Sequence, residues 1–172
     1  MKIDLIAGAR PNFMKIAPII DAINKAERTG KNISYRLVHT GQHYDANMSG
    51  SFFDHLGIPH PDINFNAGGG SQAEQTATIM TAYEKLLLTE KPDLCIVVGD
   101  VTSTMACAIP ARKMMVPVAH VEGGIRSGDW SMPEEINRVV TDSITNYFFT
   151  TSLTATENLT RTGVDKGNIF FV

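Results

Sequence analysis

Carboxylate and basic side chains gather in one stretch of the sequence, residues 116–138, which reads VPVAHVEGGIRSGDWSMPEEINR. Its first six residues are mostly apolar and β-branched, as is typical of a strand buried in a parallel sheet. Glu122 follows that run directly, and Pro133 opens a predicted helix whose first turn holds Glu134 and Glu135. Because open α/β sheets place their ligand sites at the carboxyl ends of strands, these acids are candidates for acid/base chemistry.

Some of these acids also have a simpler explanation. A helix dipole favours carboxylates in its first turn and proline is common there, which is enough to account for Glu134 or Glu135 taken alone. Glu122 is harder to explain by structure alone, because a charge at the edge of a buried sheet is costly to desolvate without a partner. Arg126 and Arg138 are candidate partners for it.

A second acidic candidate follows the plainest strand of the chain, DLCIVV at residues 93–98. This strand ends at Gly99 and Asp100, and a helix is predicted over residues 101–114. Asp100 could be a simple helix N-cap. Alternatively, because its strand lies beside the strand that carries Glu122, it could belong to the same site.

The chain begins with a strand, a glycine turn and a helix, a combination that favours anions. Residues 2–7 form the predicted strand, Gly8 closes it, and residues 11–29 form the helix, with a proline at its first position. The unpaired N–H groups and the dipole at a helix N-terminus both attract negative charge. Arg10 would add charge in the turn, and Lys15 is either a second contributor or an ordinary solvated helix residue.

Two further clusters lie at predicted strand and helix ends. The strand at residues 33–40 ends in a polar group that contains Gln42 and His43. Three glycines at residues 68–70 precede a helix over residues 71–90, whose start resembles a capping box. This glycine loop matches neither the nucleoside-triphosphate nor the dinucleotide pattern, so we interpret it as a loop that closes over a ligand.

Strands and helices alternate along the whole chain, which predicts a parallel sheet with helices on both faces and right-handed connections. The remaining predicted elements are a helix at 47–56, an extended piece at 62–65, a strand at 147–150, a helix at 153–161 and a strand at 168–172. We expect one Rossmann-like α/β domain over residues 1–172. The first strand–helix turn lacks the dinucleotide fingerprint, which argues against NAD.

Composition narrows the class of protein. The chain has 172 residues, 43% of them hydrophobic and 19% charged, enough for one full core. Its formal net charge is -3 and it has no basic block, so we expect neither nucleic acid nor a membrane as partner. Cys95 and Cys107 have no metal-ligand spacing, the histidines have no zinc pattern, and no signal peptide or membrane span is found. We therefore expect buried thiols in a reducing cytoplasm and no metal.

Several motifs together resemble one family. They are GARPNFMKIAPII at 8–20, HTGQHYDANMS at 39–49, VVGDVTST at 97–104 and HVEGGIRSGDWSMPEEINRVVTD at 120–142. Their order and spacing resemble the UDP-N-acetylglucosamine 2-epimerases, and more closely the non-hydrolysing bacterial and archaeal branch. The resemblance covers essentially the full chain. It implies a two-domain GT-B fold with the active site between two Rossmann-like halves, of which this chain corresponds to the N-terminal half.

The sequence departs from the family pattern at a few positions. Members often have Thr where Ala9 stands, Glu where Asn12 stands and Ala where Gly123 stands. The loop at residues 128–133 is shorter than in the branch that UDP-GlcNAc activates allosterically, and Asp45 replaces a glutamine of that branch. The resemblance therefore does not carry allosteric activation over to this chain, but every charged catalytic candidate is retained.

The resemblance implies a reaction and assigns residues to it. UDP-GlcNAc and UDP-ManNAc would interconvert by loss of UDP across C1 and C2, through 2-acetamidoglucal, without metal or nicotinamide cofactor. Asp100, Glu122 and Glu134 match the family's acidic residues and would share the proton transfers. The residues expected to bind the substrate are Arg10, Lys15, Gln42, His43 and Arg126.

Other functions remain open at this point. The alternatives are a hydrolysing 2-epimerase that releases ManNAc and UDP, a non-catalytic nucleotide-sugar-binding module and a GT-B glycosyltransferase domain. Three converging carboxylates favour an enzyme over a binding module, because an anionic ligand alone would call for cations. From the family we also expect a homodimer and a C-terminal domain that this chain lacks.

Overall fold

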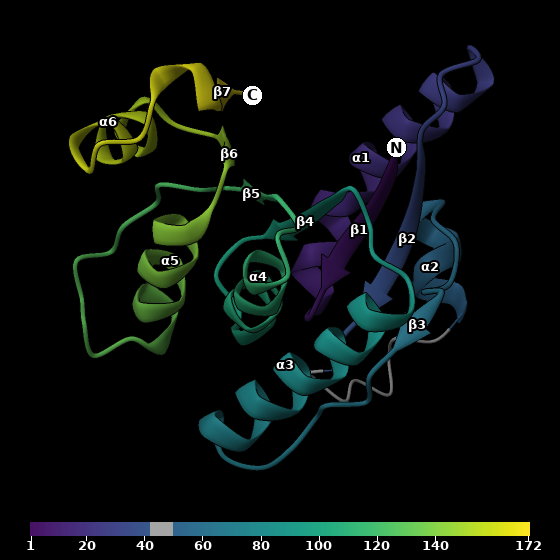
Figure 1. Cartoon of the computed structure of the whole chain (residues 1–172), viewed down its shortest axis with the longest axis horizontal. Coiled ribbons are helices and arrows are strands. Elements are labelled where there is room, and N and C mark those ends of the chain that lie inside the picture. The colour runs from purple at the N-terminus through teal and green to yellow at the C-terminus, as the bar shows by residue number, and fades with distance from the viewer. Residues whose placement is uncertain (42–49) are drawn as a thin grey trace.

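The structure, a computed structural model, describes residues 1–41 and 50–172, with the side chains of residues 50–52 not described. Its strands form a single seven-stranded sheet in the order β3-β2-β1-β4-β5-β6-β7, with every pair parallel (Figure 1). The strands are β1 (Lys2–Ala7), β2 (Ser34–His39), β3 (Ile63–Asn64), β4 (Leu94–Val98), β5 (Val118–Val121), β6 (Tyr147–Thr150) and β7 (Ile169–Phe171). The predicted parallel α/β architecture is confirmed.

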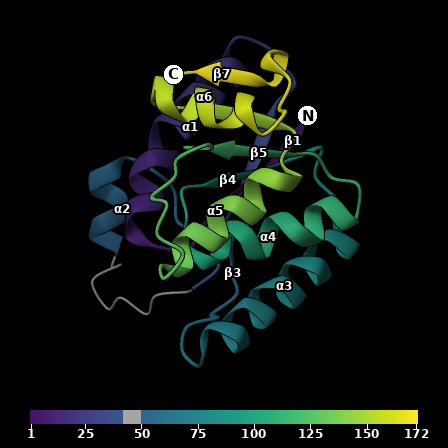
Figure 2. The same cartoon turned by 90° about the vertical axis from the view of Figure 1, so that its left-hand side faces the viewer.

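Helices cover both faces of this sheet. They are α1 (Arg10–Arg28), α2 (Gly50–Leu56), α3 (Gln72–Thr89), α4 (Thr102–Lys113), α5 (Pro133–Ile144), α6 (Leu153–Arg161) and the short 3₁₀ helix η1 (Lys166–Asn168). Helices α3, α4 and α5 pack in a row on one side, and α1 and α2 lie on the other (Figures 1 and 2). A sheet buried on both faces needs apolar side chains at successive positions, which explains the continuous apolar run of β4.

The core is therefore split into two layers by the sheet. On the α1 side, Leu5 of β1 packs with Phe13 and Ile16 of the helix. On the opposite side, Ile6 packs with Ile79 of α3 and with residues of α4. Neighbouring residues of one strand thus enter opposite cores, as the period of two in a strand requires. Both cysteines are buried free thiols, as expected, and burial raises the pKa of Cys95 to about 12.

One buried ion pair lies away from the carboxyl ends of the strands. Asp4 of β1 and Arg36 of β2 are register partners, and the guanidinium donates two hydrogen bonds of 2.9 and 2.8 Å to the carboxylate. Tyr83 of α3 donates a third, of 3.0 Å. Burial is the largest effect on Asp4 and raises the pKa of its carboxyl group, against the opposing effect of Arg36. This network joins α3 to strands β1 and β2.

The strand order reverses between β1 and β4, because the chain proceeds outward on one side through β2 and β3 and on the other through β5, β6 and β7. At such a point the connections from neighbouring strands leave in opposite directions and open a crevice at the carboxyl ends. Gly8 follows β1 and Gly99 follows β4, so both glycine turns predicted from the sequence lie at this crevice.

A few element ends differ from the prediction. Helix α4 begins at Thr102 with Val101 as its N-cap, and no side chain caps it, so the N-cap interpretation of Asp100 is wrong. Helix α1 begins at Arg10, one residue before the expected proline. The final strand is short because η1 occupies residues 166–168. The capping box of α3 is confirmed, with Ser71 and Glu74 bonding each other's backbone N–H groups.

Candidate active site

The turn between β1 and α1 is held by the side chain of Asn12, which lies in the first turn of α1. Asn12 is buried, and its Oδ1 accepts hydrogen bonds from the N–H groups of Gly8 (3.0 Å) and Ala9 (2.9 Å). Its Nδ2 donates to the carbonyl of Val98 at the end of β4, 3.1 Å away. Asn12 thus ties the two central strands together. The amide oxygen of Asn12 therefore occupies the two N–H groups of this turn, and the anion site at the N-terminus of α1 stays a prediction.

Glu122 lies at the end of β5 in an unusual backbone conformation, with φ of 68°. The left-handed region costs a residue with a side chain about 1–2 kcal/mol. Its Oε2 lies 2.5 Å from Nζ of Lys15 on α1. The partner of Glu122 is thus Lys15, and neither Arg126 nor Arg138, the two arginines considered from the sequence, occupies that position. A strained residue whose carboxylate is aimed at a cation is typical of functional sites.

Gly99 brings the end of β4 against this pair. A methyl group at Gly99 would lie 3.5 Å from Oε2 of Glu122, 3.6 Å from Nδ2 of Asn12 and 3.7 Å from Nζ of Lys15. Its φ of 70° is also one that glycine adopts without cost. Side chains of Glu122 and of the first turns of α1 therefore surround Gly99, and Asp100 is the next residue along the chain.

Asp100 is held by helix α5. Its Oδ2 forms an ion pair with Nη2 of Arg138, and its carbonyl accepts a 2.9 Å hydrogen bond from Nδ2 of Asn137. About a third of the Asp100 side chain remains exposed, whereas Arg138 is largely covered. Asp100 and Glu122 thus follow the ends of two neighbouring strands, and their partly exposed carboxylates are each paired with a different cation.

Glu134 and Glu135, which the sequence left undivided, have different environments. Glu135 is buried, and its carboxylate accepts bonds from Ser127 N and Oγ (2.9 and 3.0 Å), Gly128 N (3.2 Å) and Arg138 Nη1 (2.9 Å). Burial raises the pKa of this carboxyl group, but these hydrogen bonds outweigh burial and lower it to about 2. Glu135 anchors the loop between β5 and α5.

Glu134 instead faces a cavity of about 250 Å³. The N-termini of α3, α4 and α5 meet there, and the cavity is lined by Gly70, Gln72, Gln75, Val101, Thr102, Pro133, Glu134 and Asn137. Within the described part of the chain, no hydrogen bond or ion pair of the Glu134 carboxylate is found. The glycine loop that the sequence associated with a ligand reaches this cavity through Gly70. The described contacts do not join Glu134 directly to Asp100 or Glu122.

A buried pair that sequence reasoning missed lies behind the site. His120 of β5 is fully buried, with Nδ1 2.7 Å from Oδ1 of Asp142 and Nε2 2.7 Å from the carbonyl of Gly99. Asp142 Oδ2 accepts from Gly124 N (3.0 Å) and pairs with Nη1 of Arg126 at 2.6 Å. Burial raises the pKa of the Asp142 carboxyl group, and His120 and Arg126 together bring it below its ordinary value. A histidine inside an apolar strand was the one sequence signal for this pair.

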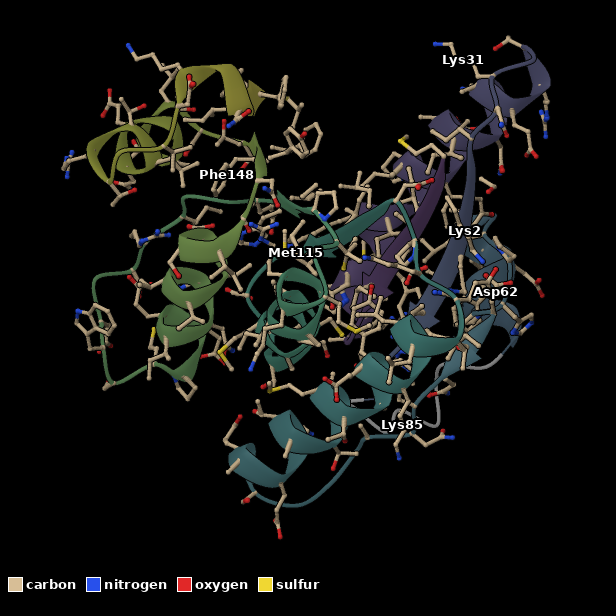
Figure 3. The ribbon with its side chains drawn as sticks, viewed as in Figure 1. Lys2, Lys31, Asp62, Lys85, Met115 and Phe148 are labelled. Atoms are coloured by element: carbon tan, nitrogen blue, oxygen red, sulfur yellow. The ribbon has the colours of Figure 1, made fainter. Side chains whose placement is uncertain are left out.

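The two glycines after Glu122 are explained by close packing. A methyl group at Gly124 would lie 2.4 Å from the carbonyl oxygen of Ala155, which no side chain allows. A methyl group at Gly123 would lie 2.9 Å from the ring of Phe148, whose buried side chain is labelled in Figure 3. It would also approach within 3.4 Å of His120 Nδ1 and Asp142 Oδ1. Phe148 and the His120–Asp142 pair therefore leave little room for a side chain at position 123.

The predicted substrate-binding residues are distributed around the same edge of the sheet. Arg10 is an exposed residue at the start of α1, and Lys15 pairs with Glu122. Arg126 is paired with Asp142 and also donates to the carbonyl of Ile125. Gln42 and His43 lie outside the described residues.

Comparison with known proteins identifies the family. The family model described as UDP-N-acetylglucosamine 2-epimerase matches residues 25–172. The chain belongs to the UDP-N-acetylglucosamine 2-epimerase family. It is 45% identical, over all of its 172 residues, to a UDP-N-acetylglucosamine 2-epimerase of Methanocaldococcus jannaschii, of which it covers 46%. It is also 43% identical over 166 residues to a UDP-2,3-diacetamido-2,3-dideoxy-D-glucuronate 2-epimerase of Pseudomonas aeruginosa, covering 96% of this chain and 46% of that protein.

Solved structures of epimerases share the fold of this family member. The M. jannaschii UDP-GlcNAc 2-epimerase in complex with UDP-GlcNAc and UDP superposes with a TM-score of 0.93 at 45% identity, over 100% of this chain and 46% of that one. The Neisseria meningitidis enzyme bound to UDP-GlcNAc gives 0.90 at 27% identity, over 99% and 45%. The chain thus spans about half the length of the relatives it matches, and corresponds to one half of their GT-B fold.

The described residues of this chain hold neither a candidate metal cluster nor a candidate membrane-spanning helix. Among residues 1–41 and 50–172, no group of three or more His, Cys, Asp or Glu side chains could hold a metal ion. In the same ranges no helix is both long and apolar enough to cross a membrane.

Proposed function

We propose that this chain is the N-terminal domain of a non-hydrolysing UDP-GlcNAc 2-epimerase, which interconverts UDP-GlcNAc and UDP-ManNAc. The observation that carries the proposal is the position of Asp100 and Glu122 at the ends of two neighbouring strands, each paired with its own cation, in a chain of this family. The relative from M. jannaschii, crystallised with UDP-GlcNAc and UDP, supports the choice of ligand.

The reaction requires what this arrangement offers. A carboxylate removes the hydrogen on C2 as a proton, the electron pair of that C–H bond forms the C1–C2 double bond, and the C1–O bond breaks so that UDP leaves with its electrons. The product pair is UDP and 2-acetamidoglucal. In the return step UDP adds to C1 and a proton is delivered to the opposite face of C2. Acids on both sides of the sugar are therefore needed, and the proton on C2 is weakly acidic, so removal must accompany departure of UDP.

We assign the proton transfers and the grip on the sugar to Asp100, Glu122 and Glu134, without dividing the steps among them. The ion pairs with Arg138 and Lys15 fix the directions of the Asp100 and Glu122 carboxylates. The cavity beside Glu134, at the meeting of three helix N-termini, would accept polar groups of the sugar. Arg10 and Lys15 would stabilise negative charge that develops on UDP, and Gln42, His43 and Arg126 would complete the substrate contacts.

The rest of the active site is assigned to a second domain. The relatives are about twice as long as this chain, and we propose that a C-terminal domain of the same protein closes over the crevice and holds most of the nucleotide. We also propose a homodimer in the cytoplasm. The C-terminal domain and the dimer follow from the family resemblance, and the cytoplasm from the two free cysteines.

The experiment is to incubate the intact protein with UDP-GlcNAc in deuterated water and to follow C2 by NMR. An epimerase places deuterium at C2 of both UDP-GlcNAc and UDP-ManNAc. Release of free ManNAc and UDP would indicate the hydrolysing reaction, and binding without exchange would indicate a binding module. A glycosyltransferase would transfer GlcNAc to an acceptor and leave C2 protonated. Absence of exchange over the whole range of pH in which the protein is folded overturns the proposal.

The relative from P. aeruginosa makes a second nucleotide sugar a specific candidate, because it is 43% identical to this chain. The same exchange experiment is therefore run in parallel with UDP-2,3-diacetamido-2,3-dideoxy-D-glucuronate. The ratio of kcat/KM for the two sugars decides between them. We expect UDP-GlcNAc to be preferred, and a ratio below one would reassign the substrate within the same reaction class.

A further inference from the structure

The buried His120–Asp142 pair touches both turns that carry the proposed catalytic carboxylates. Through Nε2, His120 holds the carbonyl of Gly99, the residue directly before Asp100. Through Oδ2, Asp142 holds the N–H of Gly124, two residues after Glu122. The pair is itself joined by the 2.7 Å contact between Nδ1 and Oδ1. One buried unit thus connects the end of β4 to the end of β5.

The hydrogens of the ring follow from its partners. A backbone carbonyl can only accept, so Nε2 of His120 carries a hydrogen and donates it to Gly99. Nδ1 faces a carboxylate that also receives the Gly124 N–H and the Arg126 guanidinium, so this carboxylate is an acceptor as well. Two acceptors are satisfied together when the ring donates from both nitrogens. The ring can then hold the Gly99 peptide in a single orientation.

The direction of the Asp100 side chain depends on that peptide. Gly99 has φ of 70°, and glycine at such a position can reach several neighbouring conformations. Rotation of the Gly99–Asp100 peptide would turn the Asp100 carboxylate away from Arg138. Asn137 restrains the carbonyl on the far side of Asp100, and His120 restrains the carbonyl on the near side. Without His120 one of these two restraints is lost.

We propose that His120 and Asp142 are positioning residues that hold the Gly99–Asp100 and Glu122–Gly124 turns in fixed relation, so that both carboxylates meet the sugar together. Both side chains are buried, so the pair acts by holding the two turns and, through Asp142, the guanidinium of Arg126. This inference rests on the proposed function for its effect on turnover. Its effect on the two turns does not depend on the substrate.

The test uses the intact protein with three variants. His120→Leu removes both donors, His120→Gln keeps one side-chain donor that can face the Gly99 carbonyl, and Asp142→Asn removes the charge while keeping the size. The matched control is Tyr83→Phe, which removes a hydrogen bond to the buried carboxylate of Asp4 far from the site. The control shows what loss of a buried hydrogen bond does to stability alone.

Two readouts are measured at a temperature where every variant is folded. The first is amide hydrogen exchange at residues 99–101 and 122–124. The second is the rate of C2 deuterium incorporation, resolved into kcat and KM. For His120→Leu and Asp142→Asn we expect faster amide exchange confined to these two turns, and kcat lowered about 10- to 100-fold with KM within about 3-fold, since small misplacements of catalytic groups cost this much. His120→Gln should recover part of kcat, and Tyr83→Phe should retain wild-type kcat.

Each outcome decides a separate point. Wild-type kcat and unchanged amide exchange in Asp142→Asn would overturn the inference, even if that variant melts earlier. If His120→Leu does not fold, His120→Gln and Asp142→Asn give the decision. If the wild-type protein shows no C2 exchange at all, the proposed function fails, whereas the amide exchange of the variants still tests whether the pair holds the two turns.

Discussion

Lys15 and Glu122 lie 107 positions apart in the sequence, and their side chains meet at 2.5 Å across the carboxyl ends of the central strands. Both are partly exposed, at 37% and 24% of their side chains, so the pair is accessible from the crevice. A partly exposed ion pair contributes at most about 1 kcal/mol, which is less than the strain of Glu122 at φ of 68° is expected to cost. Stability alone therefore does not explain why Glu122 occupies this position.

The first prediction separates the effect of Glu122 on stability from its effect on turnover. Glu122→Gln loses the charge and keeps the strained side chain, whereas Glu122→Gly loses both. We expect both variants to lower turnover by about two orders of magnitude or more, as loss of an acid/base group does. We expect Glu122→Gly to be more stable than Glu122→Gln by about 0.5–1 kcal/mol. Glycine removes the backbone strain at this position, and its larger loss of backbone entropy on folding cancels only part of that gain.

Urea titrations of the two variants, followed by circular dichroism, measure this difference directly. The comparison is matched because neither variant can form the ion pair with Lys15. Equal stabilities would show that Glu122 is not strained. Near-normal turnover in either variant would remove Glu122 from the catalytic residues.

The second prediction concerns the other two acids. Asp100→Asn and Glu134→Gln should each lower turnover by about two orders of magnitude while the fold is retained. Their costs in stability should differ, because Asp100 pairs with Arg138 and no partner of Glu134 is found among the described residues. Thermal melts should therefore show a loss for Asp100→Asn and almost none for Glu134→Gln. Glu135→Gln is the adjacent control, with the opposite expectation of a large loss of stability.

The third prediction is that Glu135 makes stability depend on pH in the acidic range. The pKa of its carboxyl group is about 2 in the folded protein, against 4.5 for a free glutamate side chain. A depressed folded-state pKa stabilises the protein above the unfolded value, and this stabilisation is lost as pH falls through the folded value. The contribution is of the order of 3 kcal/mol at pH 7.

Urea unfolding of wild type and Glu135→Gln between pH 7 and pH 2 tests this linkage. The stability difference between them should be full above about pH 5 and shrink as pH approaches 2. A difference that stays constant across the range would show that the loop hydrogen bonds to Glu135 do not depend on its charge.

The sequence was sufficient for the architecture and for the placement of Asp100 and Glu122 at strand ends. Apolar runs and glycine turns predict the bounds of strands β1 and β6 and of helix α6 to within a residue. The apolar character of the strands is required because the sheet is buried on both faces. The polar residues after β4 and β5 were identified because strand ends are chemically distinct from strand interiors. The individual partners were not predictable, since Lys15 meets Glu122 only after helix α1 has been placed beside β1.

The different environments of neighbouring acids could not be predicted from the residue pattern either. Glu134 and Glu135 are adjacent in one helical turn, and which of them faces the loop and which faces the cavity depends on the rotation of α5. Asp142 carries no local signal at all, because its partner His120 comes from a strand 22 positions earlier. Asn12 was noted only as a departure from the family, and its closure of the Gly8–Ala9 turn appears once β1 and β4 are side by side.

The fourth prediction concerns Arg10. Because Asn12 occupies the Gly8 and Ala9 N–H groups, an anion at this turn would depend on charged side chains. We expect Arg10→Ala to raise the dissociation constant of UDP or to slow its departure. Calorimetry with UDP and the rate of glucal formation measure the two effects, and Arg28→Ala at the far end of α1 is the control. If both quantities are unchanged in Arg10→Ala, Arg10 has no part in binding the nucleotide.

The last prediction is that these 172 residues, expressed alone, fold but do not epimerise. Two core layers and a complete seven-stranded sheet are sufficient for an independent domain, so we expect one cooperative melt. Turnover needs more than the carboxylates, because the sugar must be held against Asp100 and Glu122 and separated from water. Loss of that positioning can account for about 7 kcal/mol of a barrier. The assay is UDP-ManNAc formation by the purified chain, with the intact protein as reference and the melt as proof of folding. Turnover equal to that of the intact protein would show that the crevice needs no second domain, whereas a folded chain without turnover is the result we expect.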